Sequence, residues 1–156
     1  MLRIGFVGWR GMVGSVLMGR MREAEDFKGF EPVFFSTSNV GGNGPETGLD
    51  APLLKDAYDI GSLSSLDVII TCQGGGYTQK VHPELIKNGW KGYWIDSAST
   101  LRLNDDSIIV LDPVNRSVID DGLQAGIKTF VGGNCTVSLM LMALSGLFAG
   151  NHIEWI

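Results

Sequence analysis

The segment VGGNCTVSLMLMALSGLF, residues 131–148, contains one cysteine, Cys135, between a pair of glycines and an apolar run. Cysteine attacks a carbonyl group only as the thiolate. The glycines would end a strand, and Asn134 is of a type that caps helices. The N–H groups of a helix start stabilise a thiolate and an oxyanion. The pattern predicts a nucleophile at a helix start. An inert core thiol is the alternative, because free cysteines are among the most buried side chains.

A second stretch, GFVGWRGMVGSV, spaces Gly8, Gly11 and Gly14 as G-x-x-G-x-x-G between an apolar strand and a helical pattern. Such a turn lets the backbone approach a pyrophosphate, which the free N–H groups of the helix then bind. The spacing differs from the usual G-x-G-x-x-G, so the interpretation depends mainly on the position of these glycines between a strand and a helix. It predicts dinucleotide binding, and the alternative is a tight turn that binds nothing.

The end of the next predicted strand indicates which dinucleotide this site would bind. NAD sites place an acidic residue there, about 20 residues after the glycines, to bind the ribose 2′-hydroxyl. This chain instead has Ser-Thr-Ser-Asn at residues 36–39. The hydroxyls of Thr37 and Ser38 can donate to a 2′-phosphate, and Arg10 adds positive charge. NADP is therefore favoured over NAD, although a strand end rich in hydroxyls can also have no ligand role.

A second glycine cluster, CQGGGY, follows the apolar run at residues 66–72. Loops at the carboxyl ends of parallel strands form the ligand crevice of open α/β sheets. We therefore expect Gln73 to contact the cofactor, with the glycines leaving space for it. Cys72 ends the apolar strand and is expected to be a buried, unreactive thiol.

Strand-like and helical segments alternate along the whole chain. Strands are predicted at residues 2–9, 31–38, 66–72, 93–96, 107–111 and 128–131, helices at 13–23, 78–88, 115–125 and from Cys135, and a loop at 39–49. Alternation of this kind predicts an α/β fold with a doubly wound, mainly parallel Rossmann-like sheet and helices on both faces.

Composition excludes several other classes of protein. The net charge is −5, the pI is near 4.9 and the basic residues do not cluster, which argues against nucleic acid and anionic membranes as partners. No apolar run approaches the roughly 18–20 residues that cross a bilayer. The two cysteines lie too far apart for a zinc knuckle or a disulfide framework, so no metal is expected and a cytoplasmic setting is the default.

Several segments together carry a resemblance to a known family. GFVGWRGMVGSVLM, PVFFSTS, TCQGG, the Leu-Arg pair at 101–102, VLDPVN and VGGNCTVSLMLMAL resemble, in order and spacing, the Gram-negative bacterial form of aspartate-semialdehyde dehydrogenase. The resemblance runs along the whole chain. It implies NADPH-dependent reductive dephosphorylation of L-aspartyl 4-phosphate to L-aspartate 4-semialdehyde, a step shared by lysine, threonine, methionine and isoleucine biosynthesis.

The same resemblance assigns roles residue by residue. Cys135 matches the nucleophile that forms a thioacyl intermediate, and Asn134 matches the residue beside it that organises the site. Arg102 matches a residue that binds the substrate phosphate or inorganic phosphate. The residues expected to contact NADP are Gly8, Arg10, Gly11, Met12, Val13, Thr37, Ser38 and Gln73.

The chain departs from the family in length, because members are more than twice as long. Their second, mixed α/β domain supplies a substrate-binding glutamine and arginine, an acid/base histidine and most of a homodimer interface. We therefore expect residues 1–134 to form the NADP-binding domain and residues 135–156 to begin that second domain, with HIEWI as its first strand. His82 and His152 are expected at the surface. Without the acid/base histidine, this chain alone is expected to be inactive.

Two alternatives stay open at this point. N-acetyl-glutamyl-phosphate reductase also reduces an acyl phosphate with a cysteine and NADPH, so its family is the nearest enzymatic rival. A nucleotide-binding module without catalysis is the rival from another class of protein. Only the segment around Cys135 separates that module from an enzyme.

Overall fold

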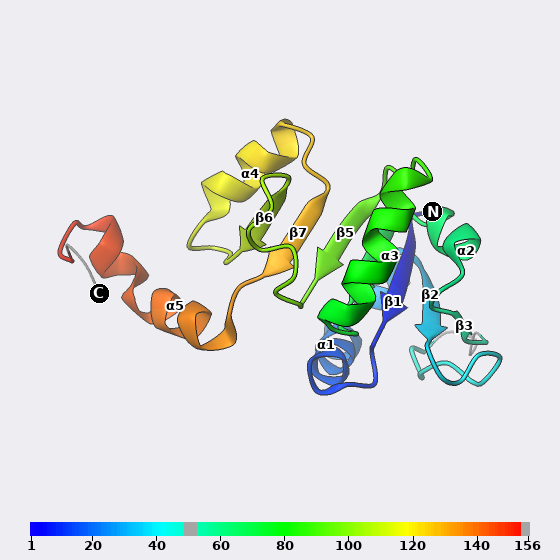
Figure 1. The fold of residues 1–156 in the computed structure, drawn as a ribbon. Coiled ribbons are helices and arrows are strands. Elements are labelled where there is room, and N and C mark those ends of the chain that lie inside the picture. Colours follow the sequence, from blue (N-terminus) through cyan, green and yellow to red (C-terminus); the bar gives the residue numbers. More distant parts are fainter. Residues whose placement is uncertain (49–52, 154–156) are drawn as a thin grey trace.

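In the computed structural model, which describes residues 1–48 and 53–153, the chain forms one parallel sheet with helices on both faces (Figure 1). The strand order is β3-β2-β1-β4-β5-β7-β6 and every pairing is parallel. The predicted doubly wound α/β fold is confirmed. The strands are β1 Arg3–Val7, β2 Glu31–Ser36, β3 Lys55–Asp56, β4 Val68–Thr71, β5 Tyr93–Asp96, β6 Ser107–Val110 and β7 Thr129–Gly132.

The helices occupy most of the predicted positions. They are α1 Met12–Glu23, the short 3-10 helix η1 Asp26–Gly29, α2 Ile60–Ser64, α3 Gly75–Lys87, α4 Arg116–Gln124 and α5 Cys135–Ala149. β3 and α2 were not predicted, because segments of two and five residues carry too few positions to show a period. α3 begins three residues earlier than predicted, with Gly75 and Gly76 in its first turn despite the low helix propensity of glycine. The predicted strand HIEWI lies largely outside the described residues.

The register brings the ends of the central strands to one edge of the sheet. Val7 of β1 lies opposite Thr71 of β4, which lies opposite Asp96 of β5, and Asp96 lies opposite Val131 of β7. α1, α3 and α5 all begin at this carboxyl edge (Figure 1). Residues that follow β1, β4, β5 and β7 can therefore act on one ligand.

Two apolar clusters pack on opposite faces of the sheet. On one face, Leu63 of α2 and Tyr77, Val81 and Leu85 of α3 pack against a fully buried Trp94. On the other face, Met18 of α1 and Phe27 of η1 pack against strand residues that include Phe6, Phe34 and Val68. Because β1 and β4 contribute to both clusters, they read as continuous apolar runs, as central parallel strands do.

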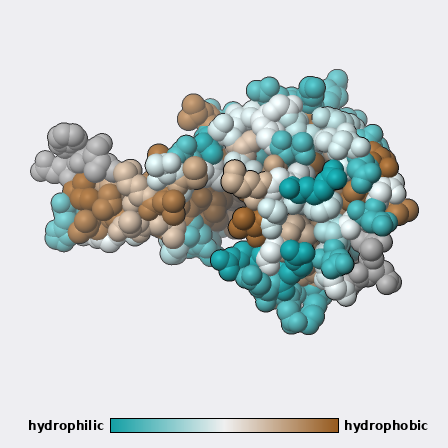
Figure 2. All heavy atoms as spheres, turned by 90° about the horizontal axis from the view of Figure 1, so that it is seen from below, coloured by the Kyte–Doolittle hydropathy of each residue, from teal (hydrophilic) through white to brown (hydrophobic). Residues whose placement is uncertain are grey.

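Helix α5 differs from the other helices because it extends away from the sheet (Figure 1). Of its fifteen residues, all of which are described, none is buried, and Leu139 is 73% exposed. Its apolar side chains form a prominent hydrophobic surface beside the body of the molecule (Figure 2). A helix that is apolar on all sides is normally covered by other elements. Among residues 1–48 and 53–153, no helix combines the length and apolar character that crossing a membrane requires.

Candidate functional site

The glycine turn between β1 and α1 packs tightly against the loop after β4. Gly8 has a left-handed φ of 73°, and a Cβ at this position would overlap the backbone of Cys72 and Gln73. The Gly11 N–H donates to the Gly8 carbonyl over 3.1 Å, which closes the turn directly before α1. Within the described residues, no side chain caps this helix, so its first N–H groups face the carboxyl edge of the sheet.

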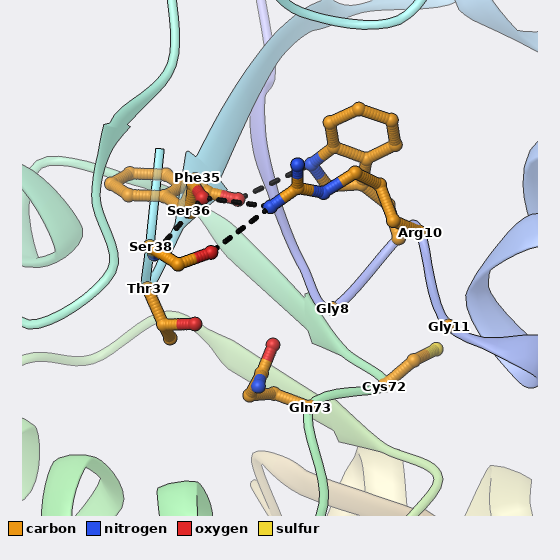
Figure 3. A pocket seen from close by; sticks show the side chains of 10 residues that line it. Gly8, Arg10, Gly11, Phe35, Ser36, Thr37, Ser38, Cys72 and Gln73 are labelled. Atoms are coloured by element: carbon orange, nitrogen blue, oxygen red, sulfur yellow. Dashed lines mark hydrogen bonds between the residues drawn. The ribbon is translucent and has the colours of Figure 1, made fainter. Parts of the chain in front are cut away.

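A cavity of about 340 Å³ opens between the glycine turn, the end of β2 and the loop after β4 (Figure 3). Most of the predicted cofactor residues line it, but Met12 and Val13 do not. Met12 and Val13 are the first two residues of α1, and their side chains are 84% and 55% exposed. The lining residues are Gly8, Trp9, Arg10, Gly11, Phe35, Ser36, Thr37, Ser38, Cys72 and Gln73.

Arg10 is held over the hydroxyl groups at the end of β2 (Figure 3). Its Nη2 donates to Ser36 Oγ at 3.1 Å and to Ser38 Oγ at 3.4 Å. The guanidinium also lies 5.5 Å from the ring centroid of Trp9, and Trp9 Nε1 donates to the Phe35 carbonyl at 3.2 Å. A cation among hydroxyl groups suits a phosphate. None of the ten lining residues, all of them within the described chain, carries a carboxylate.

Sequence reasoning missed the part that Ser36 plays in this cavity. Its side chain is buried, and its Oγ accepts hydrogen bonds from the N–H groups of Ser38 and Asn39 at 3.2 and 2.9 Å, in addition to the bond from Arg10. Ser36 therefore orients the turn that carries Thr37 and Ser38. The only signal in the sequence was its place in the run of three hydroxyl residues.

The segment around Cys135 has the predicted local geometry. Cys135 is the first residue of α5, and Asn134 caps the helix with its Oδ1, which accepts hydrogen bonds from the N–H groups of Thr136 and Val137 at 3.0 and 3.1 Å. The Cys135 side chain is exposed, so the alternative of a buried core thiol is wrong for this chain. Because Asn134 occupies two N–H groups of the first turn, those groups are not free to bind an oxyanion, contrary to the expectation from sequence.

Arg102 lies close to the turn that leads into α5. Its Nε donates to the Gly132 carbonyl at 2.8 Å, and its Nη2 donates to the Gly133 carbonyl at 3.0 Å. Arg102 was assigned a role by resemblance alone, and nothing in the sequence indicated these contacts. The structure thus brings Arg102, Asn134 and Cys135 together at the end of β7.

A second cavity lies along the carboxyl edge of the sheet, between α1 and the end of β7. It has a volume of about 470 Å³, shares Cys72 with the first cavity and extends past Ile95 and Phe130 to Gly132. Val13 also lines it, so this predicted cofactor residue faces the second cavity and not the first. Arg10 lines the first cavity, Gly132 of the turn before Cys135 lines the second, and Cys72 lines both.

The two histidines lie in different surroundings. His82 is buried on α3, where its ring packs edge-on against Trp94 with the centroids 5.1 Å apart, and burial lowers the pKa of its imidazole. The prediction that His82 lies at the surface was wrong, because the apolar residues next to it on α3 turn this face toward the sheet. His152 is exposed, as predicted. Among the described residues, no three His, Cys, Asp or Glu side chains gather to hold a metal ion.

The fold and the site define a Rossmann-type nucleotide-binding domain with an exposed cysteine at a helix start. The chain belongs to the semialdehyde dehydrogenase family, because its residues 3–122 match the family described as "Semialdehyde dehydrogenase, NAD binding domain". It is 52% identical to aspartate semialdehyde dehydrogenase from Francisella tularensis, with a TM-score of 0.91. That match covers 97% of this chain and 42% of the Francisella chain, so this chain spans less than half of that relative.

More distant structures share the fold. Aspartate semialdehyde dehydrogenase II of Vibrio cholerae, in a complex with ASA, is 21% identical with a TM-score of 0.75, and the match covers 96% of this chain and 47% of that one. The aspartate semialdehyde dehydrogenase of Candida albicans with NADP is 15% identical with a TM-score of 0.67, again over 96% and 47% of the two chains.

The two cysteines are expected to differ in reactivity. Burial, together with the negative charge of Asp96, raises the pKa of the half-buried Cys72 thiol despite an opposing hydrogen bond from Ser97. Iodoacetamide at pH 7.5 should therefore modify the exposed Cys135 on the order of tenfold faster than Cys72. Mass spectrometry of the two peptides measures both rates, and urea-unfolded protein, in which the rates should converge, is the control. Equal and slow labelling of the folded protein would favour the module without catalysis.

Proposed function

We propose that this chain is the cofactor-binding part of an NADP-dependent aspartate-semialdehyde dehydrogenase, which converts L-aspartyl 4-phosphate into L-aspartate 4-semialdehyde and phosphate. The observation that carries the proposal is the exposed Cys135 at a capped helix start, at the same carboxyl edge of the sheet as the cavity in which Arg10 donates to the hydroxyls of Ser36 and Ser38. The 52% identity to the Francisella protein supports the choice of substrate.

NADP is the cofactor that the lining residues fit. The Arg10 guanidinium and the hydroxyls of Thr37 and Ser38 would bind the 2′-phosphate, and Gly8, Gly11 and the N–H groups of Met12 and Val13 would face the pyrophosphate. Gln73 would contact the part of the cofactor that passes over Cys72 toward the second cavity. When bound, NADPH supplies the hydride.

Cys135 carries the covalent chemistry in this proposal. Its thiolate attacks the acyl carbon of the substrate, the bond from that carbon to the phosphate oxygen breaks, and phosphate leaves from a site next to Arg102. The thioacyl group then accepts a hydride, and the C–S bond breaks to release the aldehyde and restore the thiolate. Because two N–H groups fix the position of Asn134 Oδ1, they also fix the orientation of the amide, and its Nδ2 is a donor that suits the developing oxyanion.

The remaining assignments concern the protein that carries this domain. We place it in the cytoplasm as a homodimer that serves lysine, threonine, methionine and isoleucine biosynthesis, with residues 1–134 as the NADP-binding domain and residues 135–156 leading into a second domain. That second domain would supply the acid/base histidine, whose contribution to such reactions is about 10²–10⁴ in rate. The 156-residue chain alone would then turn over negligibly.

A substrate comparison tests the proposal. In the protein as its gene encodes it, we expect kcat/KM for aspartate semialdehyde, with phosphate and NADP⁺, to exceed that for N-acetyl-glutamate semialdehyde by at least about 100-fold, because the wrong substrate leaves polar groups of the site unpaired. Production of NADPH, followed by absorbance, measures both reactions. A preference for the acetylated substrate would favour the reductase alternative. A readily measured rate from the 156-residue chain alone would contradict its expected inactivity.

A further inference from the structure

Arg102 makes two hydrogen bonds that phosphate binding does not require. Nε and Nη2, which form one edge of the guanidinium, donate to the consecutive carbonyls of Gly132 and Gly133 at 2.8 and 3.0 Å. A charged donor makes such bonds stronger than those between neutral groups. The other edge, formed by Nη1 and the second proton of Nη2, makes neither of these two bonds and can bind an anion. One guanidinium can therefore hold the turn and a phosphate at the same time.

The turn that Arg102 contacts is one that needs support. Two successive glycines separate β7 from Asn134, and glycine loses more conformational freedom on ordering than any other residue. Gly133 also packs closely against Ser138 of α5, because a Cβ at this position would overlap the Ser138 hydroxyl. The position of the Asn134 cap, and with it that of Cys135, depends on how these two carbonyls are oriented.

Arg102 is itself anchored to the core of the sheet. Its N–H donates to the Ser99 carbonyl at 3.2 Å, and the turn that starts this loop is fixed by Asp96, whose Oδ1 accepts from the Ala98 N–H at 2.8 Å. Asp96 is buried at the end of β5, where its Oδ2 accepts from Thr78 Oγ1 at 2.6 Å and from Trp94 Nε1 at 3.3 Å. Hydrogen bonds at both ends of the loop after β5 thus hold Arg102 in place relative to the buried Asp96.

We propose that Arg102 is a positioning residue, which holds the Gly132–Gly133 turn and thereby the Asn134 cap and Cys135 in place whether or not phosphate is bound. The inference rests on the proposed function insofar as Cys135 is the nucleophile. In this proposal the Arg102 side chain has two roles, because it binds phosphate and also supports the turn. Arg102→Lys separates the two roles, because lysine keeps the positive charge but cannot hold two carbonyls with one planar edge.

The test compares Arg102→Lys and Arg102→Met with the wild type, in the protein as its gene encodes it and in buffer without phosphate. Hydrogen exchange is followed in residues 131–138, which include the capped N–H groups of Thr136 and Val137, with β1 as the reference for global folding. Loss of the two charge-assisted bonds should speed exchange of residues 131–138 by about tenfold or more in both variants and leave β1 unchanged. Wild-type exchange in Arg102→Lys would overturn the proposal.

Kinetics give a second readout. If Arg102 positions Cys135, kcat of Arg102→Lys at saturating phosphate should fall by about tenfold or more. A variant that raises only the KM for phosphate, with unchanged kcat and exchange, would mean that Arg102 binds phosphate and nothing else.

A Cys135→Ser variant run in parallel separates the two hypotheses. If it stays active, the proposed function fails, while the exchange experiment still decides whether Arg102 holds the turn. If β1 exchange also rises in Arg102→Lys, the decision rests on Arg102→Met, whose uncharged side chain has a similar length. Faster exchange of residues 131–138 than of β1 in that variant supports the proposal, and equal changes in the two segments overturn it.

Discussion

Replacement of Cys135 by serine, in the protein as its gene encodes it, is expected to reduce kcat by at least about 10⁴-fold. A hydroxyl is far less ionised than a thiol at neutral pH, so the attack on the acyl phosphate loses its nucleophile and the release of the aldehyde loses a good leaving group. Cys135 is exposed and lies outside the two apolar clusters, so stability should change little. The measurement is NADPH production from aspartate semialdehyde and phosphate, with thermal unfolding as the check on folding.

Ser145 offers a matched control on the same helix. Its Oγ donates to the Met142 carbonyl within α5, and it lines neither of the two cavities at the carboxyl edge. Ser145→Ala should therefore keep wild-type kcat. If Cys135→Ser retained more than about one hundredth of the wild-type rate, a covalent thioacyl mechanism at this residue would be ruled out, because a serine hydroxyl is a much weaker nucleophile than the thiolate that it replaces.

Replacement of Ser38 by aspartate should weaken NADPH binding by about 100-fold and leave NADH binding within a few-fold of wild type. Ser38 Oγ accepts a bond from Arg10 at the exposed end of β2, where a 2′-phosphate would lie. Two like charges about 4 Å apart repel by about 4 kcal/mol at an effective dielectric constant of 20. Solvent reduces this to about 2–3 kcal/mol, which corresponds to the expected change. Fluorescence titration with each nucleotide measures both dissociation constants.

Ser38→Asn is the matched control for this experiment, since it has the size of aspartate without the charge. It should weaken NADPH binding by less than about tenfold, the value of one ordinary hydrogen bond. If the two variants weakened NADPH equally, the loss of the hydroxyl and not the charge would be responsible. An unchanged ratio of the two dissociation constants in Ser38→Asp would mean that the 2′-phosphate does not bind at this strand end.

Much of the fold was predicted from residues that are neighbours along the chain. The apolar runs of β1, β4 and β7 and the Gly-Gly-Asn-Cys start of α5 depend on residues that are neighbours along the chain, so their period and composition predicted them. The same holds for the Asn134 cap. The start of α3 was predicted less well, because it lies at Gly75. The low helix propensity of glycine favours a later start, whereas in the structure the helix includes Gly75 and Gly76.

The features that the sequence did not reveal involve contacts between residues far apart in the chain. Ser36 and Arg10 are 26 positions apart, and Arg102 and Gly132 are 30 apart. These pairs meet because parallel pairing sets β1 beside β2 and β5 beside β7, and no local period specifies which strands pair. His82 illustrates the same limit, since only the docking of α3 on Trp94 buries its ring.

The sequence by itself determined the fold class, most of the strands and helices in their order along the chain, and the residue types that a nucleotide-binding turn and a helix-start cysteine require. Only the tertiary structure decided that Cys135 is exposed, that Ser36 orders the hydroxyl turn and that Arg102 supports the turn before Cys135. The reason is physical: side-chain chemistry and local conformation are properties of short segments, whereas burial and the partners of a guanidinium or hydroxyl depend on which distant segments the sheet brings together.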